Sequence, residues 1–149
     1  DLFIIDTGSV FDSYFCDFDR NFAFGHICDE AKKAYKVVFD ATDAGFSAAQ
    51  VGNTTSDVYH AMNNVMQKGG ALGNSVGRLG HGLGLQLTEW PSNTATDNTT
   101  LKPGVILTLE PGMAYLPGKE MVHEENIVIT ENGPEWLTKR ASEELPIIQ

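Results

Sequence analysis

The chain has 149 residues, of which 42% are hydrophobic and 20% are charged, and its formal net charge is −10. This length supports one domain with a real hydrophobic core and excludes two domains of ordinary size. The acidic balance argues against a nucleic-acid-binding surface, which needs a basic stripe, and no apolar run approaches the roughly 18–20 residues of a membrane span. The two cysteines, Cys16 and Cys28, are too few for a disulfide scaffold, so we expect reduced thiols and a cytoplasmic protein.

The N-terminal segment predicts a β-hairpin. An apolar run, residues 2–6, reads as a buried strand that ends in Asp6, and turn-forming residues come after it at Gly8-Ser9 and Asp12-Ser13. From Tyr14 onward the pattern has a period of two, which is typical of a strand with one core face. The side expected to face the core carries Tyr14, Cys16, Phe18, Arg20, Phe22 and Phe24. The side expected to be wet or functional carries Phe15, Asp17, Asp19 and Asn21.

Two helices are predicted after Gly25. In the first, apolar residues recur at spacings of three and four between Ala31 and Ala41, and we expect Gly45 to end it. The second begins after the capping residues 54–57, carries the apolar stripe Val58, Met62, Val65 and Met66, and ends at residues 69–70.

The remainder of the chain is predicted as strands and loops. A glycine-dense segment, residues 77–84, leads into residues 85–88, and a polar loop covers residues 92–100. Residues 105–110 and 123–130 are predicted strands. The order of hairpin, two helices and several strands indicates the α+β class, with helices covering one face of an antiparallel sheet.

Four carboxylates lie in or at the ends of these apolar strands: Asp6, Asp17, Glu110 and Glu124. A buried carboxylate without a partner costs several kcal/mol, and only one basic residue, Arg20, lies close to them in sequence. A shared divalent cation would remove this cost. Oxygen ligands suit Mn²⁺, Mg²⁺ or Ca²⁺, and a histidine added to them suits Zn²⁺, Co²⁺ or Fe²⁺.

His81 is the candidate nitrogen ligand. It stands inside Gly80-His81-Gly82-Leu83-Gly84, where flanking glycines allow close approach of the backbone and present the imidazole without crowding. His123 would point away from Glu124 on a regular strand, so we do not count it as a ligand.

These residues form four motifs that together resemble the "pita-bread" metallopeptidases, family M24, which include methionine aminopeptidases, Xaa-Pro aminopeptidases, prolidases and creatinase-like relatives. The resemblance runs from Leu2 to Thr130. The motifs are, in chain order, Asp6-Thr7-Gly8 with Asp17-Phe18-Asp19-Arg20, then Gly80-His81-Gly82-Leu83-Gly84, then Thr108-Leu109-Glu110-Pro111-Gly112-Met113, and last Glu124-Glu125-Asn126-Ile127-Val128-Ile129-Thr130.

The resemblance implies a pita-bread fold and a dinuclear metal site. The implied ligands are Asp6, Asp17, His81, Glu110 and Glu124, with Asp17 and Glu124 bridging two divalent ions that would be manganese, cobalt or zinc. The implied catalytic residues are Glu110, as general base toward a metal-bridging hydroxide, and His81. A peptide or small amide substrate and a homodimer are implied as well.

Several positions depart from the family pattern. Thr88 stands where peptidases of the family have a second histidine, so it is a candidate substrate-binding residue, and Gly77 stands where some members have another histidine. Asp19 replaces a common threonine and Val122 a common arginine. Two alternatives therefore stay open: a creatinase-like hydrolase of a small non-peptide amide or amidine, and a non-catalytic pita-bread binding module.

The chain opens inside an apparent strand, so we expect residues 1–149 to be the C-terminal portion of a single pita-bread catalytic domain, without its leading helices or any N-terminal domain. Such a portion would expose an apolar sheet face and fold poorly alone.

Overall fold

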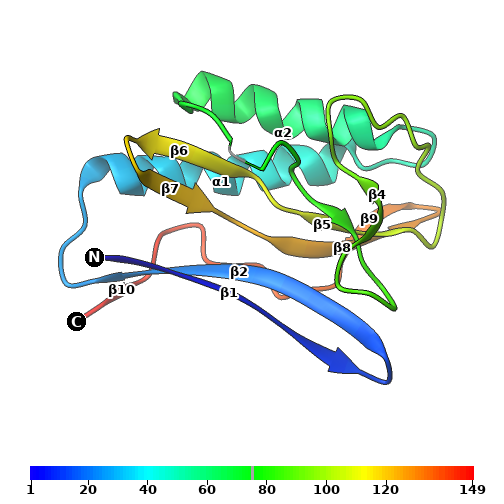
Figure 1. The fold of residues 1–149 in the computed structure, drawn as a ribbon, viewed down its shortest axis with the longest axis horizontal. Coiled ribbons are helices and arrows are strands. Elements are labelled where there is room, and N and C mark those ends of the chain that lie inside the picture. The colour runs from blue at the N-terminus through cyan, green and yellow to red at the C-terminus, as the bar shows by residue number, and fades with distance from the viewer. Residues whose placement is uncertain (75) are drawn as a thin grey trace.

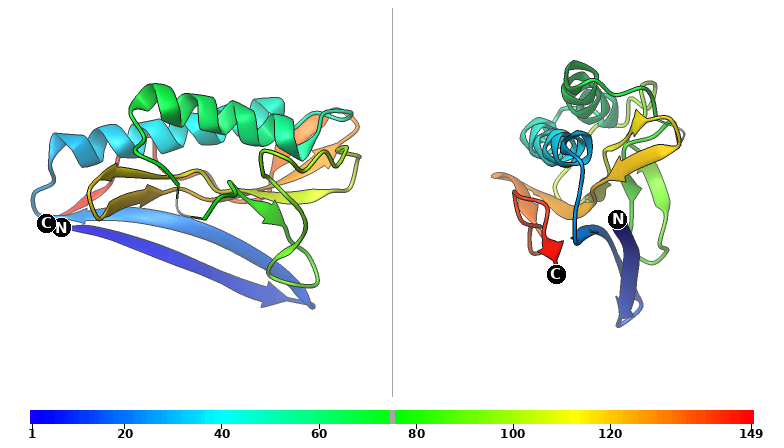
Figure 2. Two further views of the ribbon diagram at one scale, coloured as in Figure 1. Left: turned by 45° about the horizontal axis from the view of Figure 1, so that its top comes forward. Right: turned by 90° about the vertical axis from the view of Figure 1, so that its left-hand side faces the viewer.

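Two helices, a central antiparallel sheet and a long β-hairpin form three successive layers in the computed structural model (Figure 1). The structure describes residues 1–74 and 76–149. Figure 2 shows the same stacking from two further directions, with both helices on one side of the central sheet and the hairpin on the other. The α+β class and the helices covering one face of an antiparallel sheet are therefore confirmed.

The hairpin consists of β1 (Leu2–Phe11) and β2 (Tyr14–Phe24), paired in unbroken antiparallel register. Asp12 and Ser13 form the two-residue turn with φ values of 48° and 71°, the left-handed pair that a type I′ turn requires. The expected end of the first strand at Asp6 is wrong, because pairing continues through Gly8. A side chain at Gly8 would begin 2.1 Å from the carbonyl oxygen of Cys16, so the glycine permits close pairing and does not mark a turn.

The predicted core face of β2 is also wrong, because the two faces are exchanged. Asp17, Asp19 and Asn21 are buried, whereas Phe22 is only half-buried and Phe24 is 49% exposed. The acidic face packs toward the central sheet, where β2 contacts β8, and the Asn21 amide donates a hydrogen bond to the carbonyl of Val122. Contact with polar groups of the central sheet outweighs the hydrophobic pattern of this strand.

The first helix, α1 (Asp29–Ala48), runs past the glycine expected to end it. Gly45 lies in its interior at the contact with the second helix, where an added Cβ would sit 2.8 Å from the Cγ and Sδ atoms of Met62. Gly45 therefore permits the close approach of the two helices.

The second helix, α2 (Thr55–Gly69), confirms its predicted ends. Thr54 and Asp57 form a reciprocal capping box at its start, and Gly70 ends it in the left-handed conformation, with φ of 94°.

The central sheet has the strand order β4-β3-β5-β8-β9. Its members are β3 (His81–Gly82), β4 (Glu89–Ser92), β5 (Ile106–Leu109), β8 (Glu125–Thr130) and β9 (Gly133–Trp136). Strands β6 (Gly112–Leu116) and β7 (Lys119–Val122) form a separate hairpin, and β10 (Ile147–Ile148) pairs in parallel with β2. The predicted strands over residues 105–110 and 123–130 are confirmed as β5 and β8, but Glu110 and Glu124 lie just outside their ends.

The hydrophobic core lies between the helices and the sheets, since α1 contacts β5, β6 and β7. The largest fully buried apolar side chains of this core are Tyr35, Met62, Met66, Leu79, Leu101, Leu107, Leu109, Met121, Ile127 and Ile129. Large apolar side chains of β1 and β2 are instead exposed on the hairpin: Phe3, Val10, Phe11, Tyr14 and Phe24. No helix among residues 1–74 and 76–149 is long and apolar enough to cross a membrane.

Candidate metal centre

Three parts of the fold meet where the predicted ligands lie. Asp6 and Asp17 come from the hairpin, His81 from β3, and Glu110 and Glu124 from the segments next to β5 and β8. Leu109 pairs with Glu125 across β5 and β8, so the adjoining acids, Glu110 and Glu124, lie at the same end of this strand pair. The fold therefore brings together side chains that are more than 100 residues apart in sequence.

His81 lies at the centre of one group. Its Nε2 atom is 3.9 Å from Asp17 Oδ2, 4.0 Å from Glu110 Oε2 and 3.9 Å from Glu124 Oε1. These distances are too long for hydrogen bonds. Two ligand atoms that bind one ion at about 2.1 Å lie roughly 3–4 Å apart, so the spacing fits atoms arranged around a common cation.

The orientation of the imidazole leaves Nε2 available as a ligand. His81 Nδ1 lies 2.9 Å from the carbonyl oxygen of Gly82. A carbonyl only accepts, so Nδ1 carries the proton and the lone pair is on Nε2. Burial lowers the pKa of His81, which favours the neutral ring that binds metals.

The backbone around His81 is held by close contacts. Its N–H donates to Thr108 Oγ1 at 3.1 Å. Gly80 has φ of 122°, and a Cβ there would lie 2.2 Å from the carbonyl oxygen of Thr108. Glycine is therefore required at this position by both conformation and space.

A second group of possible ligands shares one residue with the first. Ligand atoms of Asp6, Asp19 and Glu124 lie within 4.8 Å of one another, as do those of Asp17, His81 and Glu124. Asp6 is exposed, whereas Asp19 and Glu124 are buried. We call the six residues the metal cluster: Asp6, Asp17, Asp19, His81, Glu110 and Glu124.

The metal cluster contains buried oxygens without hydrogen-bond partners. Among the described residues, Asp19 Oδ1, Glu110 Oε2 and Glu124 Oε1 are buried and unpaired. Such oxygens are costly in a folded protein unless a cation compensates them. The unpaired oxygens, the ligand spacing and the neutral imidazole together fit a site for divalent ions.

Burial among other acids also shifts the pKa values of carboxyl groups in the metal cluster. Burial, and to a smaller extent the charges of Glu110, Asp17 and Asp19, raises the pKa of Glu124 to about 10. Burial and the charge of Asp6 raise the pKa of Asp19 to about 7, and burial raises the pKa of Asp17 and Glu110 as well. A bound cation would favour the charged carboxylates and oppose these shifts.

Sequence reasoning missed Arg78, the positive charge that acts on the metal cluster. It lowers the pKa of Asp17 and Glu110 against the effect of burial. Its Nε atom is buried and lacks a hydrogen-bond partner among the described residues. The signal was its position three residues before His81 in the glycine-dense segment.

Asn126 was also missed. Its Oδ1 accepts a hydrogen bond from the backbone N–H of Asp17 at 3.1 Å, and its Nδ2 donates to the carbonyl oxygen of Asp17. Both bonds are buried, so Asn126 links β8 to the hairpin at the metal cluster. A polar amide inside the apolar strand 125–130 was the available signal.

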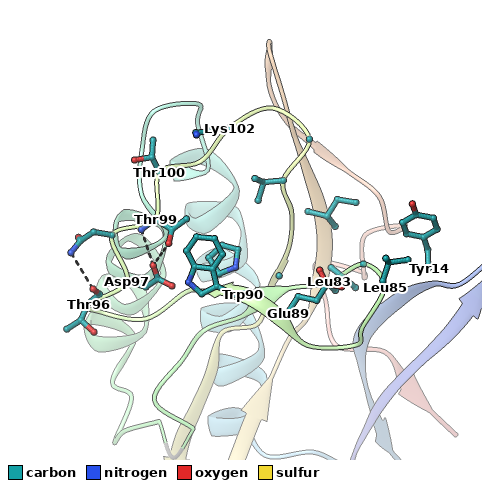
Figure 3. Close-up of a pocket in the computed structure, with 17 residues that line it drawn as sticks. Tyr14, Leu83, Leu85, Glu89, Trp90, Thr96, Asp97, Thr99, Thr100 and Lys102 are labelled. Atoms are coloured by element: carbon teal, nitrogen blue, oxygen red, sulfur yellow. Dashed lines mark hydrogen bonds between the residues drawn. The ribbon is translucent and has the colours of Figure 1, made fainter.

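Thr88 and Gly77 lie outside these groups. Thr88 is exposed in the bend before β4, and Gly77 is exposed with φ of 77°. A groove of ≈ 1060 Å³ lies nearby, lined by the 96–100 loop, Trp90, Leu83, Leu85 and Tyr14 (Figure 3). Among the described residues that line this groove, none is a predicted ligand.

Comparison with known proteins identifies relatives of this architecture. The family model for metallopeptidase family M24 matches residues 1–131. The chain is 34% identical over 144 residues to an Xaa-Pro dipeptidase from Pyrococcus furiosus, an alignment that covers 96% of this chain and 41% of that protein. The chain thus spans about two fifths of the length of this curated relative.

Solved structures give the same fold. The crystal structure of the X-Pro aminopeptidase from Thermotoga maritima matches with a TM-score of 0.88 and 28% identity, over 99% of this chain and 42% of that one. The N-terminal domain of the FACT complex subunit SPT16 from chickpea, Cicer arietinum, matches with a TM-score of 0.85 and 21% identity, over 97% of this chain and 36% of that one. The second likeness is one of fold alone.

Proposed function

Because the chain belongs to metallopeptidase family M24, we propose that it carries the metal centre of a dinuclear metal-dependent hydrolase that cleaves peptide bonds, with Xaa-Pro peptides as substrates. The relative from P. furiosus is an Xaa-Pro dipeptidase, which supports this substrate class. The observation that carries the proposal is the approach of His81 Nε2 to carboxylates from three separate segments, at 3.9–4.0 Å.

The proposed ligands of two divalent ions are Asp6, Asp17, His81, Glu110 and Glu124, and the proposed ions are manganese, cobalt or zinc. Glu124 belongs to both groups of possible ligands, which supports its role as a shared ligand. When bound, such ions supply a nucleophilic water of lowered pKa and polarise the carbonyl of the scissile bond.

Glu110 is the proposed general base. Its Oε2 atom is buried and lacks a hydrogen-bond partner among the described residues, so it is available to accept a proton. Burial raises the pKa of Glu110 above the ordinary glutamate value, and a bound cation would oppose this shift. The same oxygen can then return the proton to the leaving amine. His81 contributes through Nε2, with Nδ1 held by the carbonyl of Gly82.

Thr88 is the proposed substrate-binding residue. It is exposed, so its hydroxyl is accessible to a ligand. A threonine hydroxyl can donate and accept hydrogen bonds but does not exchange a proton near neutral pH as an imidazole does. We therefore propose that Thr88 orients substrate and that proton transfer falls to Glu110. We also propose that the protein is a cytoplasmic homodimer.

A creatinase-like hydrolase of a small amide or amidine is the second candidate. Thr88 and Gly77 favour it, because both replace histidines that the peptidases use. A binding module without catalysis is the third candidate. The intact set of five ligand residues argues against the third candidate.

The test compares hydrolysis of Xaa-Pro dipeptides with hydrolysis of other dipeptides and small amides by the protein at the full length that its gene encodes. Activity that requires Mn²⁺ or Co²⁺, disappears with chelator and is strongest on Xaa-Pro peptides supports the peptidase. Glu110→Gln, assayed at a metal concentration that saturates its weakened site, is expected to lower kcat by about 100-fold or more. Normal turnover by this variant would contradict the general-base role.

Hydrolysis of small amides with no peptide turnover would favour the creatinase-like candidate. Bound metal with no turnover of either class would favour the binding module. The variant Thr88→Val serves as a test of substrate orientation, because it keeps the shape of the side chain and removes the hydroxyl. A higher KM with metal content unchanged is expected for it.

A further inference from the structure

Asp19 is the member of the metal cluster that is not among the five proposed ligands. It lies on β2 directly opposite Asp6 of β1 in the antiparallel register. Opposed residues of such a pair project to the same face of the sheet. Their ligand oxygens and one oxygen of Glu124 accordingly lie within 4.8 Å of one another.

The Asp19 side chain is only 3% exposed, and its Oδ1 atom has no hydrogen-bond partner among the described residues. Like charges directly opposed across two strands are destabilising. An unpartnered carboxylate in this position therefore needs a positive group.

Arg20, the adjacent base, acts on Asp19 through its charge, but this effect is smaller than those of burial and of the charges of Asp6, Glu110 and Asp17, and Arg20 makes no hydrogen bond to the Asp19 carboxylate. Its guanidinium donates hydrogen bonds to the backbone oxygens of Asp19 and Glu124, at 2.7 and 3.1 Å. It also donates to Glu125 Oε2, at 3.1 Å, and to the backbone oxygen of Lys139. The Asp19 carboxylate thus remains on the opposite side of β2, among other acids.

The two groups of possible ligands differ in their chemistry. The group of Asp17, His81 and Glu124 includes an imidazole nitrogen, which suits zinc and cobalt. The group of Asp6, Asp19 and Glu124 offers carboxylate oxygens alone, which suit harder ions such as Mn²⁺ and Mg²⁺. An additional acid in the second group raises its negative charge and strengthens this difference.

We propose that Asp19 is an additional metal ligand which, with Asp6 and Glu124, forms an all-oxygen half of the centre, and that this half prefers Zn²⁺ over Mn²⁺ less strongly than the half that contains His81. This inference rests on the proposed function, because it requires the cluster to bind divalent ions. It adds to the five ligands a residue that stands where the family commonly has threonine.

The experiment titrates the metal-stripped protein, at the full length that its gene encodes, with Mn²⁺ and separately with Zn²⁺ by calorimetry. The variants are Asp19→Asn, which keeps the shape and removes the charge, and Asp19→Thr, which restores the common residue. Asp12→Asn is the matched charge control, since Asp12 lies in the exposed turn of the same hairpin. Asp17→Asn is the control for loss of a shared ligand, and circular dichroism verifies folding of each variant.

The expected result is two bound Mn²⁺ ions in the wild type and in Asp12→Asn. Both Asp19 variants should keep one ion at unchanged affinity and bind the other about 10- to 100-fold more weakly, with a smaller loss for Zn²⁺ than for Mn²⁺. Two ions bound by Asp19→Asn and Asp19→Thr at wild-type affinity, together with a loss in Asp17→Asn, would overturn the role of Asp19 and leave the proposed function intact. A wild type that binds no divalent ion would overturn both.

Discussion

Glu124 and Glu125 are consecutive, almost fully buried glutamates with opposite electrostatics. The pKa of Glu124 is raised to about 10 by burial and by neighbouring acids. Burial acts on Glu125 in the same direction, yet the approach of His123 to 3.4 Å, hydrogen bonds from Thr138 and Ala141 and the charge of Arg20 lower its pKa to about 2. Burial is common to both glutamates, so the partners decide the charge state.

Four residues surround the Glu125 carboxylate. Together with Glu125 we call them the Glu125 cluster: Glu125, Arg20, His123, Thr138 and Arg140. Glu125 Oε2 accepts from Arg20 at 3.1 Å and from the Thr138 hydroxyl, and Oε1 accepts from the N–H of Ala141 at 2.9 Å. Arg140 lies 3.5 Å from Oε1. The Glu125 carboxylate thus has hydrogen-bond donors and two arginines around it, whereas three carboxylate oxygens of the metal cluster lack hydrogen-bond partners among the described residues.

The first prediction separates the two glutamates by stability. Glu125→Gln should lower the free energy of unfolding by about 3–5 kcal/mol, because it leaves two arginines without their buried carboxylate. Glu124→Gln should leave the stability of the metal-free protein unchanged or raise it, because it removes a carboxylate that has no cation. Urea unfolding in the presence of chelator measures both. Equal losses in the two variants would contradict the comparison.

The second prediction concerns metal binding. Mn²⁺ at 100 times its dissociation constant should stabilise the wild type by about 2.7 kcal/mol for one site. Glu124→Gln should lose most of this gain, whereas Glu125→Gln should keep it despite its lower starting stability. Thermal melting with and without Mn²⁺ measures the gain. If only Glu125→Gln lost the stabilisation by Mn²⁺, Glu125 and not Glu124 would be the glutamate that binds metal.

The third prediction concerns pH. The folded-state pKa of Glu125 is depressed, so its contribution is present above the ordinary value of 4.5 and is lost as pH falls toward 2. The folded-state pKa values of Asp19 and Glu124 are raised, so the metal-free protein loses stability as pH rises from about 4 through 7 and on toward 10. Between pH 5 and pH 8 we expect a loss of several kcal/mol without metal, at about 1.4 kcal/mol per pH unit for each proton that only the folded state still holds.

Saturating Mn²⁺ should abolish that loss, because the bound ion favours the charged carboxylates. Urea midpoints at the two pH values, with chelator or with Mn²⁺, measure the effect. A metal-free protein that gains stability between pH 5 and pH 8 would show that the acids of the metal cluster are compensated by other groups.

The smallest expected effect is at the edge of the Glu125 cluster. Thr138→Val removes two hydrogen bonds, the one that its hydroxyl donates to Glu125 and the one that it accepts from the backbone N–H of Asn126 at 3.1 Å, and should cost about 2 kcal/mol. In the Glu125→Gln background the cost should be smaller, because the two residues act together. Mn²⁺ affinity should not change. A large change in Mn²⁺ affinity would show that the two clusters are coupled through β8.

The amino-acid sequence was sufficient to predict the fold class, the second helix with its N-terminal capping residues and the strands that adjoin Glu110 and Glu124. These features depend on local patterns, such as apolar periodicity and the cluster of capping residues at 54–57. The end of the first helix was mispredicted because Gly45 serves contact with Met62 of the other helix, and single-chain propensity contains no information about that contact. The short strands β6, β7 and β9 were not predicted.

By itself, the sequence determined which side chains are able to bind metal and in what order they occur, because ligand chemistry belongs to the residue types and their motifs. Only the tertiary structure decided which face of β2 is buried, since the hydrophobic pattern pointed to the opposite face. It also decided that Glu124 faces other acids while Glu125 faces arginines. The physical reason is that the free energy of a buried charge depends on its neighbours in space, and residues up to 109 positions apart in the chain supply those neighbours.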